Sequence, residues 1–331
     1  MPADVLLEIE DLRTQFHMDE GVVRAVDGVD LRVHRGETLA VVGESGCGKS
    51  VMARSILRLV DRAGHIESGR IVLHRDGGRV ELVGAESKLL RQVRWQEIAM
   101  VFQEPMASLS LVHTIGSQIV EAVRLHERVD KKVARKRAIE ILDRVGIPDP
   151  DRRVDAYPFE LSGGMRQRAM IAMALVCRPS LLIADEPTTA LDVTTQAQIL
   201  ELLKDLQGEF GMAVMLITHD LGVAAQVADT MAVMYLGRVV EYGRAEQVLS
   251  APKHPYTQAL LQSIPRLGRP SRTRLEAIRG MVPPPYDRPA GCPFHPRCDS
   301  FQAGRCDVEV PGSFPVNGGR VSCLLYDSES S

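Results

Sequence analysis

The residues best suited to chemistry form the run from Gly43 to Ser50, which has the pattern G-x-x-x-x-G-K-S. An apolar run, Leu39 to Val42, precedes it, and the spacing predicts a helix over 51–59. A strand leading through a glycine loop into a helix lets backbone N–H groups converge on phosphate oxygens. The lysine can reach the β- and γ-phosphates, and the serine hydroxyl can bind Mg²⁺. We therefore predict a nucleoside-triphosphate site that consists of Gly43, Glu44, Ser45, Gly46, Cys47, Gly48, Lys49 and Ser50.

A second pattern suits the metal and the attacking water. The apolar run Leu181 to Ala184 ends in Asp185 and Glu186. A carboxylate at the end of such a strand helps to hold Mg²⁺, which is the role we predict for Asp185. Glu186 follows directly and can polarise a water for attack on the γ-phosphate, so it is the predicted general base.

A third pattern is a second candidate anion site. Ser162, Gly163 and Gly164 open a predicted helix, so that exposed N–H groups and the positive end of the helix dipole point the same way. Read alone, Ser162 could also be a simple helix N-cap beside a flexible glycine pair. The chain thus carries two candidate anion sites.

The elements that position these motifs follow from periodicity. Residues 1–84 read as strands around one helix, residues 85–160 as a charged helical insert, and residues 161–250 as alternating strands and helices. That alternation implies a largely parallel sheet. We predict an α/β fold: a P-loop NTPase (RecA-like) core with an N-terminal antiparallel β-subdomain over 1–250. A loop-rich, proline-dense tail is expected over 251–331.

Composition limits the function classes. The 331 residues carry a net charge of −3, with 45% hydrophobic and 25% charged residues, which is ordinary for a soluble globular protein. A nucleic-acid binder would normally be strongly basic, so no nucleic-acid partner is expected. The longest apolar runs are too short to span a bilayer, and the acidic N-terminus has no secretory pattern. We expect a cytoplasmic protein whose membrane part, if any, belongs to another chain.

With these motifs in order, the first 250 residues resemble the ATP-binding cassette (ABC) family. The signature motif of the family matches Ser162 to Met165, with methionine where glutamine is commoner. The Q-loop matches Gln103, the D-loop matches Ala190 to Asp192, and the switch histidine matches His219. The resemblance implies a head-to-tail dimer in which the signature helix of one cassette closes over ATP on the P-loop of the other.

The resemblance also implies roles for single residues. Gln103 would contact Mg²⁺ and act in catalysis with Glu186, and His219 would contact the γ-phosphate. Phe16 is the candidate for stacking on adenine, with Val23 as a competitor for that position. Residues expected to bind ATP in trans, on the partner cassette, are Ser162, Gly163, Gly164, Met165 and Asp192.

Three stretches resemble the oligopeptide/dipeptide importer branch. They are Phe102 to Leu109, Asp185 to Thr195 and His254 to Leu261, although Ser110 and Leu111 replace the usual Asn-Pro. This implies an ATPase that powers peptide import from the cytoplasmic face of the plasma (inner) membrane. The implied partners are a second, related cassette, two transmembrane permease subunits and a substrate-binding protein. Import of nickel or another solute, a soluble non-transport ABC ATPase, and a metal- or redox-sensing ATPase are the alternatives.

Four cysteines are concentrated in the tail with the spacing C-x5-C-x7-C-x16-C. This is not the paired C-x2-C of a zinc ribbon, but four thiolates could hold a [4Fe–4S] cluster or a zinc ion, or stay unmetallated. His295 could be a zinc ligand or a plain surface histidine. The match of Gly291 to Cys298 with the tail of the peptide-importer branch implies a [4Fe–4S] cluster, expected as a structural staple. The ligands would be Cys292, Cys298, Cys306 and Cys323.

Overall fold

The structure is a computed structural model that describes residues 4–104, 108–189, 191–263 and 278–330. Residues 105–107 of the importer-like stretch and Ala190 of the expected D-loop therefore lie outside the described residues. The chain divides into two compact units. We call Leu7–Val33, Thr38–Val83 and Thr218–Ser331 the P-loop unit, and Met1–Leu6, His34–Glu37 and Gly84–Ile217 the signature unit. The segment after residue 250 lies within the P-loop unit.

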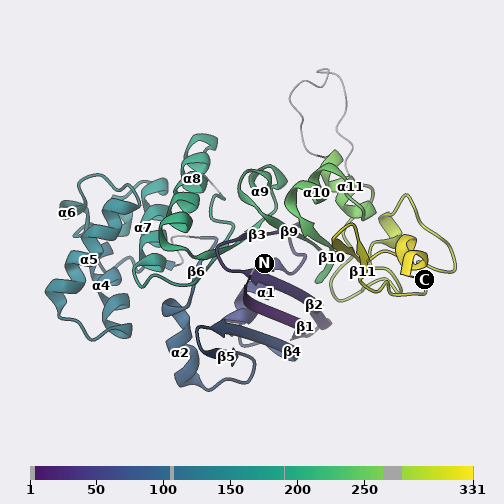
Figure 1. Cartoon of the computed structure of the whole chain (residues 1–331), viewed down its shortest axis with the longest axis horizontal. Helices are drawn as coiled ribbons and strands as arrows, with labels where there is room; N and C mark the ends of the chain where they lie inside the picture. Colours follow the sequence, from purple (N-terminus) through teal and green to yellow (C-terminus); the bar gives the residue numbers. More distant parts are fainter. Residues whose placement is uncertain (1–3, 105–107, 190, 264–277, 331) are drawn as a thin grey trace. The chain divides into compact units, whose positions relative to one another are not determined.

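The P-loop unit contains two groups of paired strands. One joins β2, β1, β4 and β5 in that order, with antiparallel β1–β4 and β4–β5 pairs, and forms the predicted N-terminal antiparallel subdomain (Figure 1). The other runs β11-β12-β10-β9-β3, in which β3 and β9 are parallel and the other pairs are antiparallel. Its elements are β1 (Val5–Met18), β2 (Gly21–His34), β3 (Thr38–Val42), α1 (Lys49–Ile56), β4 (Gly64–Arg75), β5 (Gly78–Glu81), α9 (Leu221–Val227), β9 (Thr230–Tyr235), β10 (Arg238–Arg244), α10 (Ala245–Ser250), α11 (Pro255–Gln262), β11 (Phe314–Val316) and β12 (Gly319–Val321), with short 3₁₀ segments at His295–Arg297 and Leu324–Ser330.

The signature unit combines three parallel strands with a group of helices. Strand β7 pairs in parallel with β6 on one side and β8 on the other, and its five residues are buried. Helices α4, α5 and α6 pack together and lie within the predicted helical insert, residues 85–160 (Figure 1). The elements are α2 (Ser87–Gln96), β6 (Ile98–Val101), α4 (Ile115–His126), α5 (Lys131–Arg144), α6 (Pro150–Arg153), a 3₁₀ turn at Pro158–Glu160, α7 (Gly163–Leu175), β7 (Leu181–Asp185), α8 (Val193–Phe210) and β8 (Ala213–Thr218). The α/β prediction is confirmed.

Side-chain caps explain where several helices begin. Thr114, Asp130 and Asp192 each accept a hydrogen bond from a backbone N–H in the first turn of α4, α5 and α8. The buried His254 does the same for α11, accepting from the N–H of Tyr256 at 3.0 Å, and Pro255 supplies a preformed first turn. Each of these caps is a local feature, formed by residues within three positions of one another.

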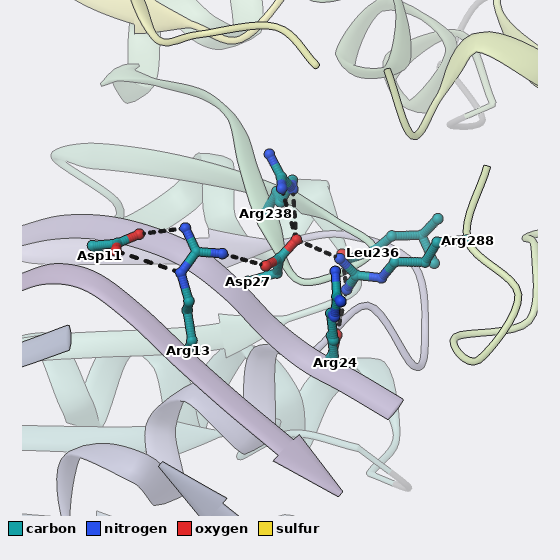
Figure 2. Close-up of polar contacts among 7 residues, drawn as sticks. All are labelled: Asp11, Arg13, Arg24, Asp27, Leu236, Arg238 and Arg288. Atoms are coloured by element: carbon teal, nitrogen blue, oxygen red, sulfur yellow. Dashed lines mark hydrogen bonds and ion pairs between the residues drawn. The ribbon is translucent and has the colours of Figure 1, made fainter. Parts of the chain in front are cut away.

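A buried aspartate ties the tail to the rest of the P-loop unit. Asp27 of β2 has a side chain only 5% exposed and forms ion pairs with Arg13 at 2.6 Å and with Arg238 and Arg288 at 2.7 Å (Figure 2). Arg288 comes from the tail and also donates to the backbone carbonyls of Leu236 and Arg24. Burial would raise the pKa of Asp27, but Arg238, Arg288 and Arg13 outweigh it, so the pKa lies below its usual value. The tail is therefore joined to β1, β2 and β10 by charge as well as by packing.

The tail also contains a hairpin that the prediction of a loop-rich segment missed. Strands β11 and β12 pair around Asn317 and Gly318, whose φ angles are 49° and 80°. Two positive φ values are what a two-residue hairpin turn requires, and Asn-Gly is the favoured pair. Strand β12 then pairs with β10, which extends the sheet into the tail. Across the described ranges, no helix combines the length and apolarity needed to cross a membrane.

Candidate active site

The P-loop backbone is held against two other segments of its unit. Gly43 and Gly48 have φ angles of 152° and 100°, and a Cβ atom there would lie 2.2 Å from the Met234 carbonyl oxygen and 2.1 Å from that of Ala25. Only glycine fits this contact, because any side chain would collide with backbone. Helix α1 then begins at Lys49 without a side-chain cap, which leaves its N-terminal turn suited to an anion.

The P-loop side chains contact the loop itself. Lys49 is buried, and its Nζ donates to the carbonyl oxygens of Gly43 at 2.8 Å and Glu44 at 3.0 Å. Cys47 is also buried, and burial raises the pKa of its thiol. Ser45 and Gly46 are exposed, and Ser50 is half-buried in the first turn of α1. The lysine therefore lies folded over the loop that the sequence predicts to hold phosphates.

The signature unit brings the predicted base and the Q-loop residue together. Gln103 follows β6 and Glu186 follows β7, so parallel pairing of these strands places both at the same edge. The Gln103 Nε2 donates to Glu186 Oε2 at 3.0 Å, and the Thr189 hydroxyl donates to the same oxygen at 2.9 Å. Asp185 is buried at the end of β7. Thr189 is not among the residues predicted from the sequence, although it follows the predicted base by only three residues.

The signature motif packs beside the start of α8. The Ser162 hydroxyl accepts from the Met165 N–H at 3.3 Å, so it is the N-cap of α7. A Cβ on Gly164 would lie 2.9 Å from the Thr195 methyl carbon, and Gly163 faces Leu191. Asp192 accepts from the Thr195 N–H at 3.0 Å and from its hydroxyl at 2.7 Å, and these hydrogen bonds lower the Asp192 pKa. The residues expected to act in trans thus gather on one surface.

The two adenine candidates differ in position within the P-loop unit. A Cβ on Gly64 would lie 2.6 Å from the Phe16 ring and from Val60, so Phe16 packs beyond the C-terminal end of α1. Val23 lies on β2, two residues from Ala25, whose carbonyl oxygen meets Gly48 and Gly237. His219 is exposed before α9, where Asp220 is the N-cap. Both Phe16 and Val23 therefore stay predictions for the adenine contact.

The tail cysteines do not support the predicted metal-binding tail. Within the four ranges that the structure describes, no three His, Cys, Asp or Glu side chains are placed to hold a metal ion. Burial raises the pKa of Cys292 to about 11, with smaller contributions from the neighbouring thiols of Cys323, Cys298 and Cys306. His295 places its Nδ1 3.0 Å from the Cys292 carbonyl oxygen.

Comparison with known proteins assigns the chain to a family. The family model described as "ABC transporter" matches residues 26–189, and the one described as "Oligopeptide/dipeptide transporter, C-terminal region" matches residues 240–306. A putative peptide import ATP-binding protein of Brucella abortus is 51% identical over 324 residues, which cover 96% of each chain. The chain belongs to the ATP-binding cassette family. Within this family, the cassette is also 47% identical to the dipeptide transport ATP-binding protein DppD of Escherichia coli, over 97% of this chain and 96% of that protein.

Solved structures agree with this assignment. The dimeric post-hydrolysis state of the ATP-binding cassette MJ0796 bound to ADP and Pi matches with a TM-score of 0.64 and 28% identity, over 72% of this chain and 99% of that one. The cassette cbiO1 of Clostridium perfringens, part of an ABC transporter complex, matches with a TM-score of 0.63 and 28% identity. The match covers 75% of this chain and 92% of that one. The cassette is therefore an ATP-hydrolysing enzyme of the α/β mixed-sheet type.

Proposed function

We propose that this cassette hydrolyses ATP to drive import of dipeptides or oligopeptides through membrane permease subunits. The observation that supports hydrolysis is the pair of hydrogen bonds to Glu186 from Gln103 and Thr189. They orient the Glu186 carboxylate, which can accept a proton from water attacking the γ-phosphate. The relatives named above are described for peptide or dipeptide transport, which favours peptides over nickel or a soluble role.

ATP would bind on the P-loop and be closed over by a second cassette. Lys49 would turn from the loop carbonyls to the β- and γ-phosphates, and the N–H groups of residues 43–50 would hold phosphate oxygens. Ser50, Gln103 and Asp185 offer oxygen donors of the kind Mg²⁺ prefers, and bound Mg²⁺ would neutralise charge on the phosphates. The partner would contribute the signature surface with Asp192, as the dimeric neighbour suggests. His219 would contact the γ-phosphate, and Phe16 would stack on adenine, with Val23 as the competitor for that position.

The transporter would contain further chains. We infer a second, related cassette, two transmembrane permeases and a substrate-binding protein, with this cassette peripheral at the cytoplasmic face of the plasma membrane. Closure on ATP does mechanical work because the closed dimer binds ATP more tightly than the open one. The cassette itself does not contact the peptide in this scheme.

We also propose a [4Fe–4S] cluster for the tail. The thiols of Cys298, Cys306 and Cys323 all act on the pKa of Cys292, so the four cysteines are electrostatic neighbours. A cubane cluster presents a separate iron to each thiolate, and its ligands therefore need not converge on one ion as zinc requires. Anaerobically purified protein should be brown, with iron and acid-labile sulfide. The colour should disappear in the variant C292S/C298S, and a colourless wild type with stoichiometric zinc would contradict the proposal.

Peptide import can be tested in proteoliposomes. The complete complex of both cassettes, both permeases and the binding protein should hydrolyse ATP faster when the binding protein carries peptide, and should accumulate that peptide. Lys49→Ala in this cassette should lower ATP binding and transport together. Stimulation by nickel and not by peptide would reject the peptide assignment while leaving the ATPase assignment intact.

A further inference from the structure

The cysteine tail contacts the P-loop directly through one buried arginine. Arg297 ends the 3₁₀ turn at His295–Arg297, immediately before Cys298, and its side chain is 4% exposed. Its Nη1 donates to Glu44 Oε2 at 2.8 Å and its Nη2 to Glu44 Oε1 at 3.1 Å. Glu44 is the second residue of the P-loop. This bidentate pair is the geometry in which an arginine holds a carboxylate most firmly.

The guanidinium is fixed from behind as well. Its Nε donates to the Arg279 carbonyl at 2.9 Å, Nη1 also lies 3.4 Å from the Tyr235 hydroxyl, and its central carbon is 5.8 Å from the Tyr235 ring centroid. Tyr235 in turn packs against Phe294, with ring centroids 5.3 Å apart. An arginine so enclosed has few alternative positions, so it can act as a rigid support.

The backbone of Glu44 is held from the C-terminal part of the chain too. Its N–H donates to the Tyr256 hydroxyl at 3.0 Å, and Tyr256 is fully buried in α11. Both supports, Tyr256 and Arg297, lie within the span 240–306 that matches the C-terminal region of peptide transporters and outside the cassette match at 26–189. Main chain and side chain of one P-loop residue are thus both bound by the extension.

We propose that Arg297 is a positioning residue for ATP, which makes the cysteine tail a working part of the phosphate-binding loop. Glu44 is an acidic residue on a loop that must receive a polyanion, and Arg297 neutralises its carboxylate and holds it in place. The proposal rests on ATP binding at this P-loop. Any change at Cys298 that moves the 3₁₀ turn would act on ATP affinity through the same pair.

The test is nucleotide affinity in the full-length chain, measured with a fluorescent ATP analogue, together with the steady-state kinetics of the assembled transporter. Arg297→Gln leaves the Glu44 carboxylate unpaired and should weaken ATP binding roughly tenfold. The KM for ATP should rise by the same factor while kcat stays within about twofold, because positioning affects bound substrate and transition state alike. Arg297→Lys keeps the charge but not the two-pronged guanidinium, so its ATP affinity should lie between those of wild type and Arg297→Gln.

Three comparisons make the result decisive. Arg279→Gln removes an exposed tail arginine paired with Asp299 and should bind ATP as wild type does. The double variant E44Q/R297Q removes the unpaired carboxylate and should regain affinity to within about threefold of wild type. Lys49→Ala reports on the ATP site itself, so its failure to lose binding would reject that site and not the role of Arg297.

Other outcomes would overturn the proposal. If Arg297→Gln lowers the melting temperature but leaves Kd and KM equal to those of Arg279→Gln, then Arg297 is only a structural anchor. If Arg297→Gln does not fold, Arg297→Lys replaces it in the test. The proposal then requires that Arg297→Lys has a higher KM for ATP than wild type. Equal affinity of R297Q and E44Q/R297Q would also contradict the charge argument.

Discussion

Glu44 and Glu186 each stand just beyond a buried strand of the cassette, yet they are held in opposite ways. Glu186 accepts hydrogen bonds from two neutral donors, the Gln103 amide and the Thr189 hydroxyl, both on exposed residues. Glu44 is bound by both arms of the buried Arg297. Neutral donors orient a carboxylate without cancelling its charge, whereas a guanidinium fork neutralises it.

The same contrast extends to the surroundings of each residue. The region that joins the tail to the P-loop unit is rich in buried polar groups, including Asp27, Glu241 and His254. The carboxylate of Asp27, for example, pairs with three arginines. Such pairing stabilises a buried charge, since unpaired buried groups are costly. Variants around Glu186 should therefore change turnover. Variants where the tail meets the P-loop unit should change stability or ATP affinity.

The largest effect should come from Glu186→Gln. The amide cannot accept a proton from the attacking water, so turnover should fall by about 10²-fold or more, the usual contribution of a general base. ATP binding should persist and the ATP-bound dimer should accumulate, as gel filtration with ATP would reveal. Glu44→Gln is the matched control, and its kcat should stay close to that of wild type. Equal losses of kcat in both variants would erase the distinction between the two glutamates.

Asp27→Asn should cause the largest loss of stability. The substitution leaves three arginines around a neutral amide, and removing one partner of a buried pair typically costs about 3–5 kcal/mol. Urea unfolding at pH 7 would measure it. Glu140→Gln, which breaks an exposed pair with Lys136 at 3.6 Å, should change the free energy of unfolding by less than about 0.5 kcal/mol. Similar midpoints for the two variants would show that the buried cluster has no special weight.

His254 should make the stability of the cassette depend on pH. Burial lowers the pKa of His254 to about 3, from an ordinary value of 6.5. Between these values the unfolded chain takes up a proton that the folded chain refuses, so stability is complete above pH 6.5 and declines as pH falls toward 3. Between pH 7 and pH 5 the loss should be about 2 kcal/mol.

The comparison for this prediction is His254→Asn, which can still cap α11 but does not titrate. The free energy of unfolding of both proteins is measured at pH 7, 6 and 5. Between pH 7 and pH 5, wild type should lose about 2 kcal/mol more than the variant does. Parallel curves across the whole range would mean that the folded protein accommodates a charged His254.

Sequence reasoning found what is local and missed what is assembled from distant segments. The P-loop, the strand ending at Asp185 and the Ser162 cap are readable because each depends on a few consecutive residues. The contact of Arg297 with Glu44 joins positions 253 residues apart, and no spacing predicts it. The approach of the Ala25 carbonyl oxygen to Gly48 is likewise a contact between distant segments that no local pattern predicts. The spacing of the tail cysteines left zinc, an iron–sulfur cluster and free thiols open, because spacing does not report how the four side chains lie relative to one another.

Thr189 gives the smallest and sharpest test of how Glu186 is oriented. Thr189→Val keeps the shape of the side chain but removes the hydroxyl that donates to Glu186 at 2.9 Å. Since Gln103 still binds the same oxygen, only one of two neutral hydrogen bonds is lost, worth about 1 kcal/mol. We expect kcat to fall by roughly fivefold with no change in KM for ATP, and Thr189→Ser should restore it. A fall in kcat as deep as that of Glu186→Gln would mean that the hydroxyl itself handles the proton, whereas an unchanged kcat would mean that Gln103 alone orients the base.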